Sequence, residues 1–544
     1  MAAEAIVSVK AGQLQGVNQK GIFVFKGVPF AAPPVGEGRW RPPQPVEPWI
    51  GVRLATKFSP TAYQRATGIE KFIDGLVNGQ GWGFARREGV KLLLKVAPKP
   101  KASEDCLYLN VRTPTLDSEA RLPVMVWIHG GDHQDGAGSE IFYDSNGLAE
   151  QGVVAVTINY RLGLMGYFAH PELMAESAQG VAGNYGTLDQ IAALRWVQEN
   201  IAAFGGDPDN VTIFGESAGG ESVIHMLTSP LARGLFHKAI AQSAANAGQM
   251  IHLKRPFLTH PAAIQSSLAF AAKAGVTGRN QLAQLRQLSA DALYKTVRQN
   301  EEMGSFYPVI DGYVLPTSPF VAFQHGQQAH VPLLIGSNAD EATLLYPMIA
   351  SPLPEYYQQP LPANEMPAFM HEAFGADLAE LVQLYPGLER RSLQSEIDFL
   401  GDLMFGARAR FYAECAAQQG QPAFLYFFTR VPPSPTQTAG AFHAAELSFV
   451  HGSSNPVLPL NAADLALSAT MMGYWTQFAR TGDPNGGKRP QWELFDPAEP
   501  GWMVLDVDKV GYEPVARERK YGLLNGRLHR QIAAMEARDL EIGD

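Results

Sequence analysis

Gly215-Glu216-Ser217-Ala218-Gly219 is the stretch that decides the fold of this chain. It follows an apolar, β-branched run over 211–214 and leads into small residues over 219–222, which predicts a strand, a sharp turn and a helix. A serine at such a turn has a strained backbone, so the positions two residues away on either side favour glycine, which has no Cβ to clash. The turn would expose the Ser217 hydroxyl and leave the Ala218 N–H at a helix N-terminus, where negative charge is favoured. The pentapeptide therefore predicts a nucleophilic serine.

Length and composition favour one large globular unit. The chain has 544 residues, of which 46% are hydrophobic and 18% charged. We find no linker, low-complexity tract or internal repeat that would separate domains. We therefore expect a single domain over residues 1–544 with long insertions, although length alone would suggest three or four domains.

Net charge and the length of the apolar runs restrict the kinds of partner and the cellular locations that we expect. The 43 lysines and arginines face 53 aspartates and glutamates, a net charge of −10, which argues against nucleic acid or an anionic membrane as the partner. No run is apolar over the length that spans a bilayer. The first residues have no basic region and no long apolar stretch. We therefore expect a cytoplasmic protein, or a periplasmic or secreted one if a signal peptide has been removed.

The two cysteines, Cys106 and Cys415, do not form a disulfide framework. Cys106 stands in apolar sequence and is expected to be a buried thiol. No histidine or cysteine lies near it at a metal-ligand spacing, so we expect no metal site there.

Continuous apolar runs alternate with helical patterns along most of the chain. Runs that are apolar throughout suit strands covered by helices on both faces. Helical spacing is clearest over Leu188–Phe204 and recurs over 261–274 and 527–540. The strand-like runs cover residues 124–128, 153–159, 211–214, 239–242, 331–335 and 423–428.

This alternation predicts an α/β fold with a large, mostly parallel central sheet covered by helices on both faces. Residues 5–30 are expected to add short antiparallel strands at the N-terminus, with turns at 11–12 and 19–21. The segments around 257–320 and 351–411 have helical patterns without matching strands. We expect these two insertions to cap the sheet and line the substrate entrance.

A nucleophilic serine needs a base, an acid that orients the base, and donors for the oxyanion. After a turn of this kind, the acid and then the base follow along the chain. Glu341 is a candidate acid, because it follows the run 331–335 and so belongs to the sheet edge where open α/β sheets place their sites. Asp340 is its rival, and periodicity alone does not choose between them.

His443 is the candidate base among the 13 histidines of the chain. It stands in a loop of small residues after the run 423–428, whereas a lone histidine is usually structural or lies at the surface. His451, eight residues further on, is the main alternative.

The oxyanion donors are expected from the loop after the run 124–128, which reads His129-Gly130-Gly131-Asp132. The backbone N–H groups of Gly131 and Asp132 would join that of Ala218. Loss of one such donor typically lowers the rate by about 10²–10³.

Further motifs are spread over nearly the whole sequence. They are the segments 25–36 (FKGVPFAAPPVG), 104–111 (EDCLYLNV), 183–186 (GNYG), 204–208 (FGGDP) ahead of the turn, and 475–485 (WTQFARTGDPN). Together with the G-x-S-x-G turn, they make the chain resemble the type-B carboxylesterase and cholinesterase family of α/β-hydrolases.

The resemblance implies roles for individual residues. The family's acid is the glutamate of an N-x-D-E segment, which falls on Glu341 and not on Asp340. Its base is a histidine followed three residues later by glutamate and then by F-V-x-G, which falls on His443 and Glu446. Supporting positions fall on Ser243, Glu446, Gly130 and Glu216.

The implied activity is hydrolysis of a small-molecule carboxylic ester through an acyl-enzyme, with no metal or organic cofactor. Activity is expected to rise with pH as His443 loses its proton. The same triad would serve an amide or carbamate hydrolase, and inactive adhesion or scaffold members can share the fold.

Two departures from the family pattern stand out. Asp132 occupies a position that is usually glycine or alanine, and His133 replaces an aromatic residue. A carboxylate beside a developing oxyanion opposes it, so the side chain must turn away or be paired, either with His133 or with a polar group of the substrate. This favours a polar or amine-bearing substrate. Cys106 has no earlier cysteine to pair with, which suggests a bacterial enzyme.

The walls of the substrate pocket are the least predictable part. Ordinary core packing is an alternative role for every apolar candidate. The candidates are His133, Trp82, Phe84, Met303, Phe306 and Phe405.

Overall fold

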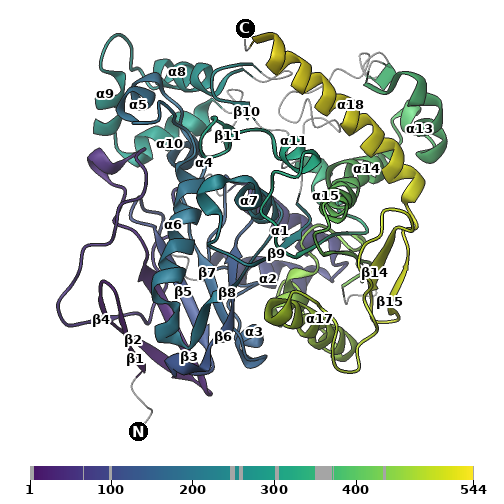
Figure 1. Ribbon diagram of the computed structural model, residues 1–544, viewed down its shortest axis with the longest axis horizontal. Helices are drawn as coiled ribbons and strands as arrows, with labels where there is room; N and C mark the ends of the chain where they lie inside the picture. Colours follow the sequence, from purple (N-terminus) through teal and green to yellow (C-terminus); the bar gives the residue numbers. More distant parts are fainter. Residues whose placement is uncertain are drawn as a thin grey trace.

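A 13-stranded sheet runs through the protein from its N-terminal to its C-terminal region (Figure 1). The computed structural model describes residues 5–64, 67–96, 101–244, 251–256, 261–300, 306–348, 370–371, 373–432 and 436–542. The strand order is β1-β2-β3-β5-β7-β6-β8-β9-β12-β13-β14-β15, and β4 pairs with β2. The strands are β1 (Ala5–Val9), β2 (Gly12–Gln19), β3 (Ile22–Pro29), β4 (Val52–Leu54), β5 (Tyr108–Thr113), β6 (Leu122–Ile128), β7 (Val154–Ile158), β8 (Gly206–Glu216), β9 (Lys238–Gln242), β12 (Leu333–Asn338), β13 (Ala423–Phe428), β14 (Gly501–Leu505) and β15 (Val510–Pro514).

The centre of the sheet is parallel and its two flanks are antiparallel. All neighbours from β7 to β14 pair in parallel. Neighbours along β1-β2-β3-β5-β7 and the β14–β15 pair are antiparallel, whereas β4 pairs with β2 in parallel. The predicted α/β fold with a mostly parallel sheet is confirmed, and all six strand-like runs contribute strands. The sequence analysis did not predict β14 and β15, although β14 is a five-residue run that is buried at every position.

Helices cover both faces of the sheet (Figure 1). The predicted helices over 188–204, 261–274 and 527–540 correspond to α6, α8 and α18. The helices are α1 (Thr67–Gly79), α2 (Phe84–Val96), α3 (Gly147–Glu150), α4 (Gly163–Tyr167), α5 (Pro171–Glu176), α6 (Tyr185–Asn200), α7 (Ala218–Thr228), α8 (Ala263–Lys273), α9 (Gln281–Gln287), α10 (Ala290–Gln299), α11 (Pro319–Gln324), α13 (Leu378–Leu384), α14 (Leu393–Gly401), α15 (Ala407–Gln418), α16 (Leu447–His451), α17 (Ala462–Thr481) and α18 (Glu518–Ile542).

Alternate residues of the central strands belong to two separate cores. On β6, Val124, Val126 and Ile128 join one core, whereas Met125 and Trp127 join the other. Successive side chains of a strand point to opposite faces, so a strand covered on both sides must be apolar at every position. This is the physical reason why the central strands read as continuous apolar runs.

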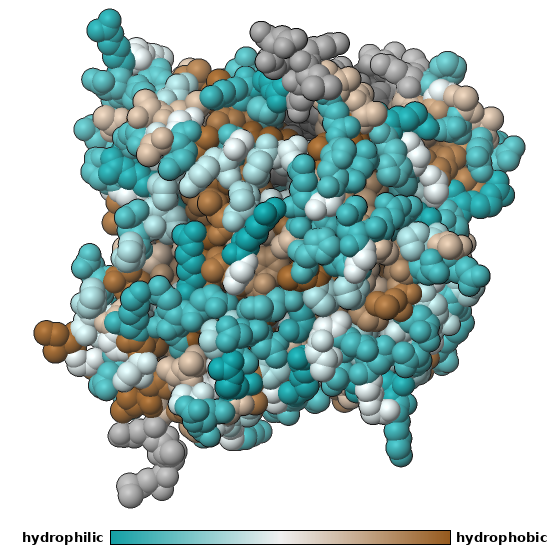
Figure 2. Space-filling view, in the orientation of Figure 1, coloured by the Kyte–Doolittle hydropathy of each residue, from teal (hydrophilic) through white to brown (hydrophobic). Residues whose placement is uncertain are grey.

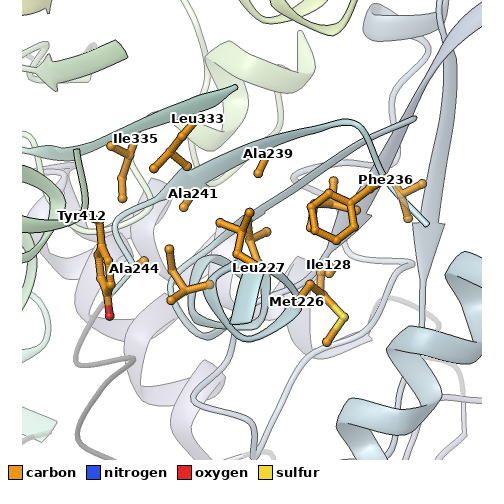
Figure 3. Packing of buried hydrophobic residues seen from close by; sticks show 14 of the residues in the cluster. Ile128, Met226, Leu227, Phe236, Ala239, Ala241, Ala244, Leu333, Ile335 and Tyr412 are labelled. Carbon is orange, nitrogen blue, oxygen red and sulfur yellow. The ribbon is translucent and has the colours of Figure 1, made fainter. Parts of the chain in front are cut away.

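Helix α7 packs directly against the strands that carry the site (Figure 3). Leu227 of α7 lies near Ala241 of β9, whereas Ile335 of β12 and Tyr412 of α15 lie together at one side of the cluster. The small alanines of β9 leave room for the helix to approach the sheet closely. The start of α7, and with it Ser217, is thereby fixed relative to the strand ends.

The segments outside the sheet are mainly helical, as expected. Between 257 and 320, helices α8, α9 and α10 share a satellite core with residues of α4, α5 and α6, and short strands β10 (Ile251–His252) and β11 (Val309–Ile310) pair with each other. The insertion over 351–411 contains α13, α14 and the start of α15, and its residues 351–369 and 372 lie outside the described part. That the two insertions cap the active site stays a prediction.

Surface and cysteines agree with a large globular protein. The face in Figure 2 is mainly hydrophilic, with apolar residues in patches between polar ones. Both cysteines are free and buried, and burial raises the pKa of the Cys415 thiol to about 12. No helix in the described ranges is both long and apolar enough to cross a bilayer.

A buried ion pair ties α6 to the loop after β7. Arg161 donates from Nε and Nη2 to the carboxylate of Asp189 at 2.7 and 2.8 Å, and both side chains are almost fully buried. Removal of one partner leaves an uncompensated buried charge, which typically costs about 3–5 kcal/mol.

We therefore expect Asp189→Asn to lower the free energy of unfolding by about 3–5 kcal/mol, measured by chemical denaturation. Glu199→Gln is the matched control, because it removes an exposed ion pair with Lys10, and it should change that free energy by less than about 1 kcal/mol. Equal effects of the two substitutions would contradict this account.

Candidate active site

The turn between β8 and α7 has the strained geometry that the G-x-S-x-G pentapeptide predicts. Ser217 has φ of 57° and ψ of −127°, a conformation that L-residues rarely adopt. A Cβ on Gly215 would lie 2.5 Å from the backbone of Gly219, and a Cβ on Gly219 would overlap the carbonyl oxygen of Ile128. Only glycine fits at both positions, because the turn packs against the end of β6.

The loops after β12 and β13 bring a carboxylate and an imidazole together. Glu341 Oε2 lies 2.6 Å from His443 Nδ1, and both side chains are buried. The other carboxylate oxygen, Oε1, accepts hydrogen bonds from the Ser243 hydroxyl at 2.6 Å and from the Asn338 backbone N–H at 2.7 Å. A carboxylate held in this way can fix the tautomer and the orientation of the ring.

The two alternatives from the sequence have other partners. Asp340 Oδ2 accepts from the backbone N–H of Ala441 at 2.7 Å, so it pins the loop that carries His443. His451 is packed among the rings of Trp127, Phe214 and Tyr143 in the core. Burial lowers the pKa of His451 to about 3, which keeps this imidazole neutral.

Glu446 is a further buried carboxylate near His443, and two side-chain amides hold it in place. Its carboxylate accepts from Gln242 Nε2 at 2.9 Å and from Asn338 Nδ2 at 2.6 Å. Trp475 Nε1 in turn donates to Gln242 Oε1 at 3.0 Å. Burial raises the pKa of Glu446. Asn338 Nδ2 also donates to the Phe442 carbonyl at 2.9 Å, which fixes the residue before His443.

The residue before the serine also reaches the imidazole. Glu216 Oε1 lies 3.1 Å from His443 Nε2, and both groups are buried. Burial lowers the pKa of His443, but the negative charges of Glu216 and Glu341 outweigh it and raise that pKa to about 9. Burial raises the pKa of Glu216 as well. Because the pKa values of both His443 and Glu216 are raised, this buried pair binds a proton tightly.

The loop after β6 lies over the serine turn. A Cβ on Gly130 would be 3.1 Å from the Cβ of Ser217. Gly131, Asp132 and His133 follow with φ of 104°, 56° and 53°, a run of left-handed conformations that turns the loop back on itself. Ala218 is the first residue of α7, so its N–H has no acceptor within the helix.

The unusual Asp132-His133 pair is divided between two partners. Asp132 Oδ2 accepts a hydrogen bond of 2.8 Å from the Tyr307 hydroxyl. His133 Nε2 lies 3.2 Å from Glu221 Oε2 on the first turn of α7. Burial lowers the pKa of His133 to about 3 and raises that of Glu221 to about 8. At neutral pH a protonated Glu221 can therefore donate to a neutral His133.

The predicted pocket residues do not all gather at the site. Phe405 does, with its ring centroid 4.8 Å from that of His443. Phe306 packs against Phe168 and Phe270 in the satellite core. Trp82 is half-buried and Phe84 is 73% exposed at the start of α2. Met303 lies outside the described residues.

Sequence reasoning missed several groups around the site. Tyr307 is separated from Asp132 by 175 positions, and no local pattern connects the two. Glu221 gave a usable signal, because it is a charged residue one helical turn after the nucleophile in a helix start of small residues. No cluster of three or more His, Cys, Asp or Glu side chains suited to a metal ion occurs in the described ranges.

Comparison with known proteins finds relatives along nearly the whole chain. The model of the carboxylesterase family matches residues 3–523. The para-nitrobenzyl esterase of Bacillus subtilis (strain 168) is 36% identical over 530 residues, which cover 95% of this chain and 98% of that protein. The fumonisin B1 esterase of Sphingopyxis macrogoltabida is 34% identical over 500 residues, which cover 90% and 84%. A solved structure of a PNB esterase matches with a TM-score of 0.76 at 35% identity and covers 96% of this chain and all of the other.

Proposed function

We propose a mechanism for this chain, which belongs to the carboxylesterase family and is a serine hydrolase that cleaves carboxylic esters. In this mechanism Ser217 is the nucleophile, His443 is its general base and Glu341 orients the base. The observation that carries the assignment is the 2.6 Å contact between Glu341 Oε2 and His443 Nδ1. It supports the assignment because a carboxylate at Nδ1 leaves Nε2 as the nitrogen that takes the proton of the serine.

The reaction has two halves. Ser217 Oγ attacks the ester carbonyl while His443 Nε2 takes its proton, and the protonated His443 then gives that proton to the leaving alcohol. Water hydrolyses the acyl-serine by the same steps in reverse. Glu216, the neighbour of Ser217 in the chain, lies 3.1 Å from Nε2 through its Oε1, so this nitrogen is on the side of the ring that faces the serine turn.

The oxyanion is proposed to bind the backbone N–H groups of Gly131, Asp132 and Ala218. The closeness of Gly130 to Ser217 and the position of Ala218 at the start of α7 support this. The carboxylate of Asp132 would oppose the oxyanion if it faced it. Its hydrogen bond with the Tyr307 hydroxyl gives the carboxylate another partner.

Within this mechanism we assign Asp132 the role of favouring cationic substrates. Asp132 is exposed. It stands two residues after Gly130, and Gly130 lies against Ser217. A substrate bound at Ser217 would therefore pass close to the carboxylate. Opposite charges about 4 Å apart attract by about 1 kcal/mol in water and about 4 kcal/mol near a protein surface.

Ser217→Ala tests the nucleophile. The acyl-serine cannot form without the hydroxyl, so the burst of alcohol release from an aryl ester should disappear, and steady hydrolysis should fall by about 10⁴-fold or more. Stopped-flow absorbance measures the burst, and circular dichroism verifies that the fold survives. Undiminished hydrolysis in a folded Ser217→Ala protein would remove Ser217 from this role.

The pH dependence tests the base. Below its folded pKa of about 9, His443 is protonated and cannot take the serine proton. The value of kcat/KM should therefore rise about tenfold per pH unit below that pKa and level off above it. Glu216→Gln removes a charge that raises the pKa of His443, so the midpoint should move to lower pH.

Glu446→Gln is the control for this measurement. Glu446 also raises the pKa of His443, but it is the weakest of the named contributors, so the midpoint should move less. A wild-type midpoint near the usual histidine value of about 6.5 would contradict the proposed charge arrangement.

Asp132→Asn tests the substrate preference. Butyrylcholine and 3,3-dimethylbutyl butyrate have the same shape and differ in charge. The ratio of their kcat/KM values should fall at least about fivefold in Asp132→Asn, which corresponds to about 1 kcal/mol. Asp132→Glu keeps the charge and should keep most of the preference. An unchanged ratio in Asp132→Asn would show that Asp132 does not select for charge.

A further inference from the structure

Helix α2 presents apolar side chains to solvent along its length. None of its described residues is buried. Phe84, Leu92, Leu93 and Val96 are 73%, 61%, 49% and 66% exposed. Single exposed apolar residues are common on protein surfaces, but four on one helix are not explained by chance exposure.

Three of these side chains, Leu92, Leu93 and Val96, share one face of the helix, and that face is not the one that packs. Phe84 is the first residue of α2 and lies outside this face. Ala85, Gly89, Leu92 and Val96 follow one another at spacings of three and four residues, so they form a stripe. Leu93 borders it. Val90 and Leu94, on the opposite side, pack against the core together with Phe72 and Ile73 of α1. The outward stripe is therefore apolar without contributing to the core.

The same segment is strongly basic within an acidic protein. Residues 84–101 contain six lysines and arginines and one glutamate, a net charge of +5, which leaves −15 for the remainder. Arg86, Arg87, Lys91 and Lys95 belong to α2 itself. Lys91 pairs with Asp74 of α1 at 2.6 Å, and Arg86 lies over the ring of Trp82 at 4.3 Å.

We propose that α2 docks this protein on an anionic lipid surface. A helix with Leu and Val on one face and Lys and Arg beside them lies in the boundary between headgroups and acyl chains, where both kinds of side chain are satisfied. Negative headgroups attract the basic residues and hold the acidic remainder of the protein away from the surface. A second copy of the chain is a poorer occupant, because facing α2 helices would bring two segments of +5 together.

Helices α1 and α2 pack together and connect this surface to the catalytic loop. The carbonyl of Gly79, at the end of α1, accepts a hydrogen bond of 2.9 Å from the Thr438 N–H. The ring of Phe72 meets that of Phe442, the residue before His443, with centroids 6.4 Å apart. A protein docked through α2 would thus hold the His443 loop near esters that reside in the lipid.

Vesicle flotation of the full-length protein tests the proposal. Vesicles of phosphatidylcholine with 30% phosphatidylglycerol should carry the protein upward in the gradient, and vesicles of phosphatidylcholine alone should carry at least about tenfold less. Binding should fall with 0.5 M salt, since the basic residues are screened.

Substitutions separate the apolar contribution to membrane binding from the electrostatic one. Leu92→Gln with Leu93→Gln should lower the partition coefficient at least tenfold, and Lys95→Gln should lower it by about fivefold. The matched control is Leu393→Gln with Leu465→Gln, because those leucines are 59% and 50% exposed on other helices. It should leave binding unchanged. Hydrolysis of a water-soluble aryl ester should be the same in all variants, which shows that they are folded.

Three results would overturn the proposal. They are absence of flotation with anionic vesicles, equal binding to both kinds of vesicle, and equal losses in the α2 and control variants. Sedimentation velocity tests the alternative, in which a second copy of the chain covers α2. A wild-type dimer that does not bind vesicles, and that dissociates in Leu92→Gln with Leu93→Gln, would make α2 an interface between copies.

Discussion

The site depends on how closely the turn after β8 approaches the end of β6. Gly219 lies so close to the Ile128 carbonyl that a Cβ on it would overlap the carbonyl oxygen. This close packing of the two backbones holds Ser217 at a φ of 57°. Such a conformation costs about 1–3 kcal/mol and persists only where the surrounding packing determines it. Helix α7, packed on β8 and β9, supplies that packing (Figure 3). Asp132, His133, Ser243 and Ala444 also have positive φ, so half of the ten non-glycine residues with positive φ in the described chain lie around the reacting groups.

Burial of three carboxylates around one imidazole is the second constraint. Glu216, Glu341 and Glu446 are all buried near His443, and buried carboxylates need partners. Glu341 and Glu446 are each held by two donors, and Asn338 serves both through its backbone N–H and its side chain. Glu216 has the imidazole itself as its partner. The base is thus positioned and made more basic by the same set of charges, at the cost of a higher pH for full activity.

Local sequence predicts those parts of the protein that local physics determines. Strand β13 has the predicted bounds, because a strand buried on both faces must be apolar throughout. Periodicity does not separate Glu341 from Asp340, since both follow the same strand. The geometry separates them by their partners, because Glu341 contacts the His443 ring and Asp340 accepts from the Ala441 backbone. The partners of Asp132 and His133 were beyond sequence reasoning. Tyr307 and Glu221 reach them from segments 175 and 88 positions away, and such pairs depend on how the loops pack in three dimensions.

The net charge of the whole chain conceals the opposite charge of one segment. A value of −10 argues against anionic partners if the charge is spread evenly. Here residues 84–101 carry +5 beside an exposed apolar stripe, and the remainder is correspondingly more acidic. Screening limits electrostatic reach to about 8–10 Å at physiological salt, so a nearby surface senses the segment that faces it and not the sum over the molecule. The charge that decides a partner is therefore that of the contacting helix, and acidity elsewhere in the molecule favours the orientation in which α2 faces the partner.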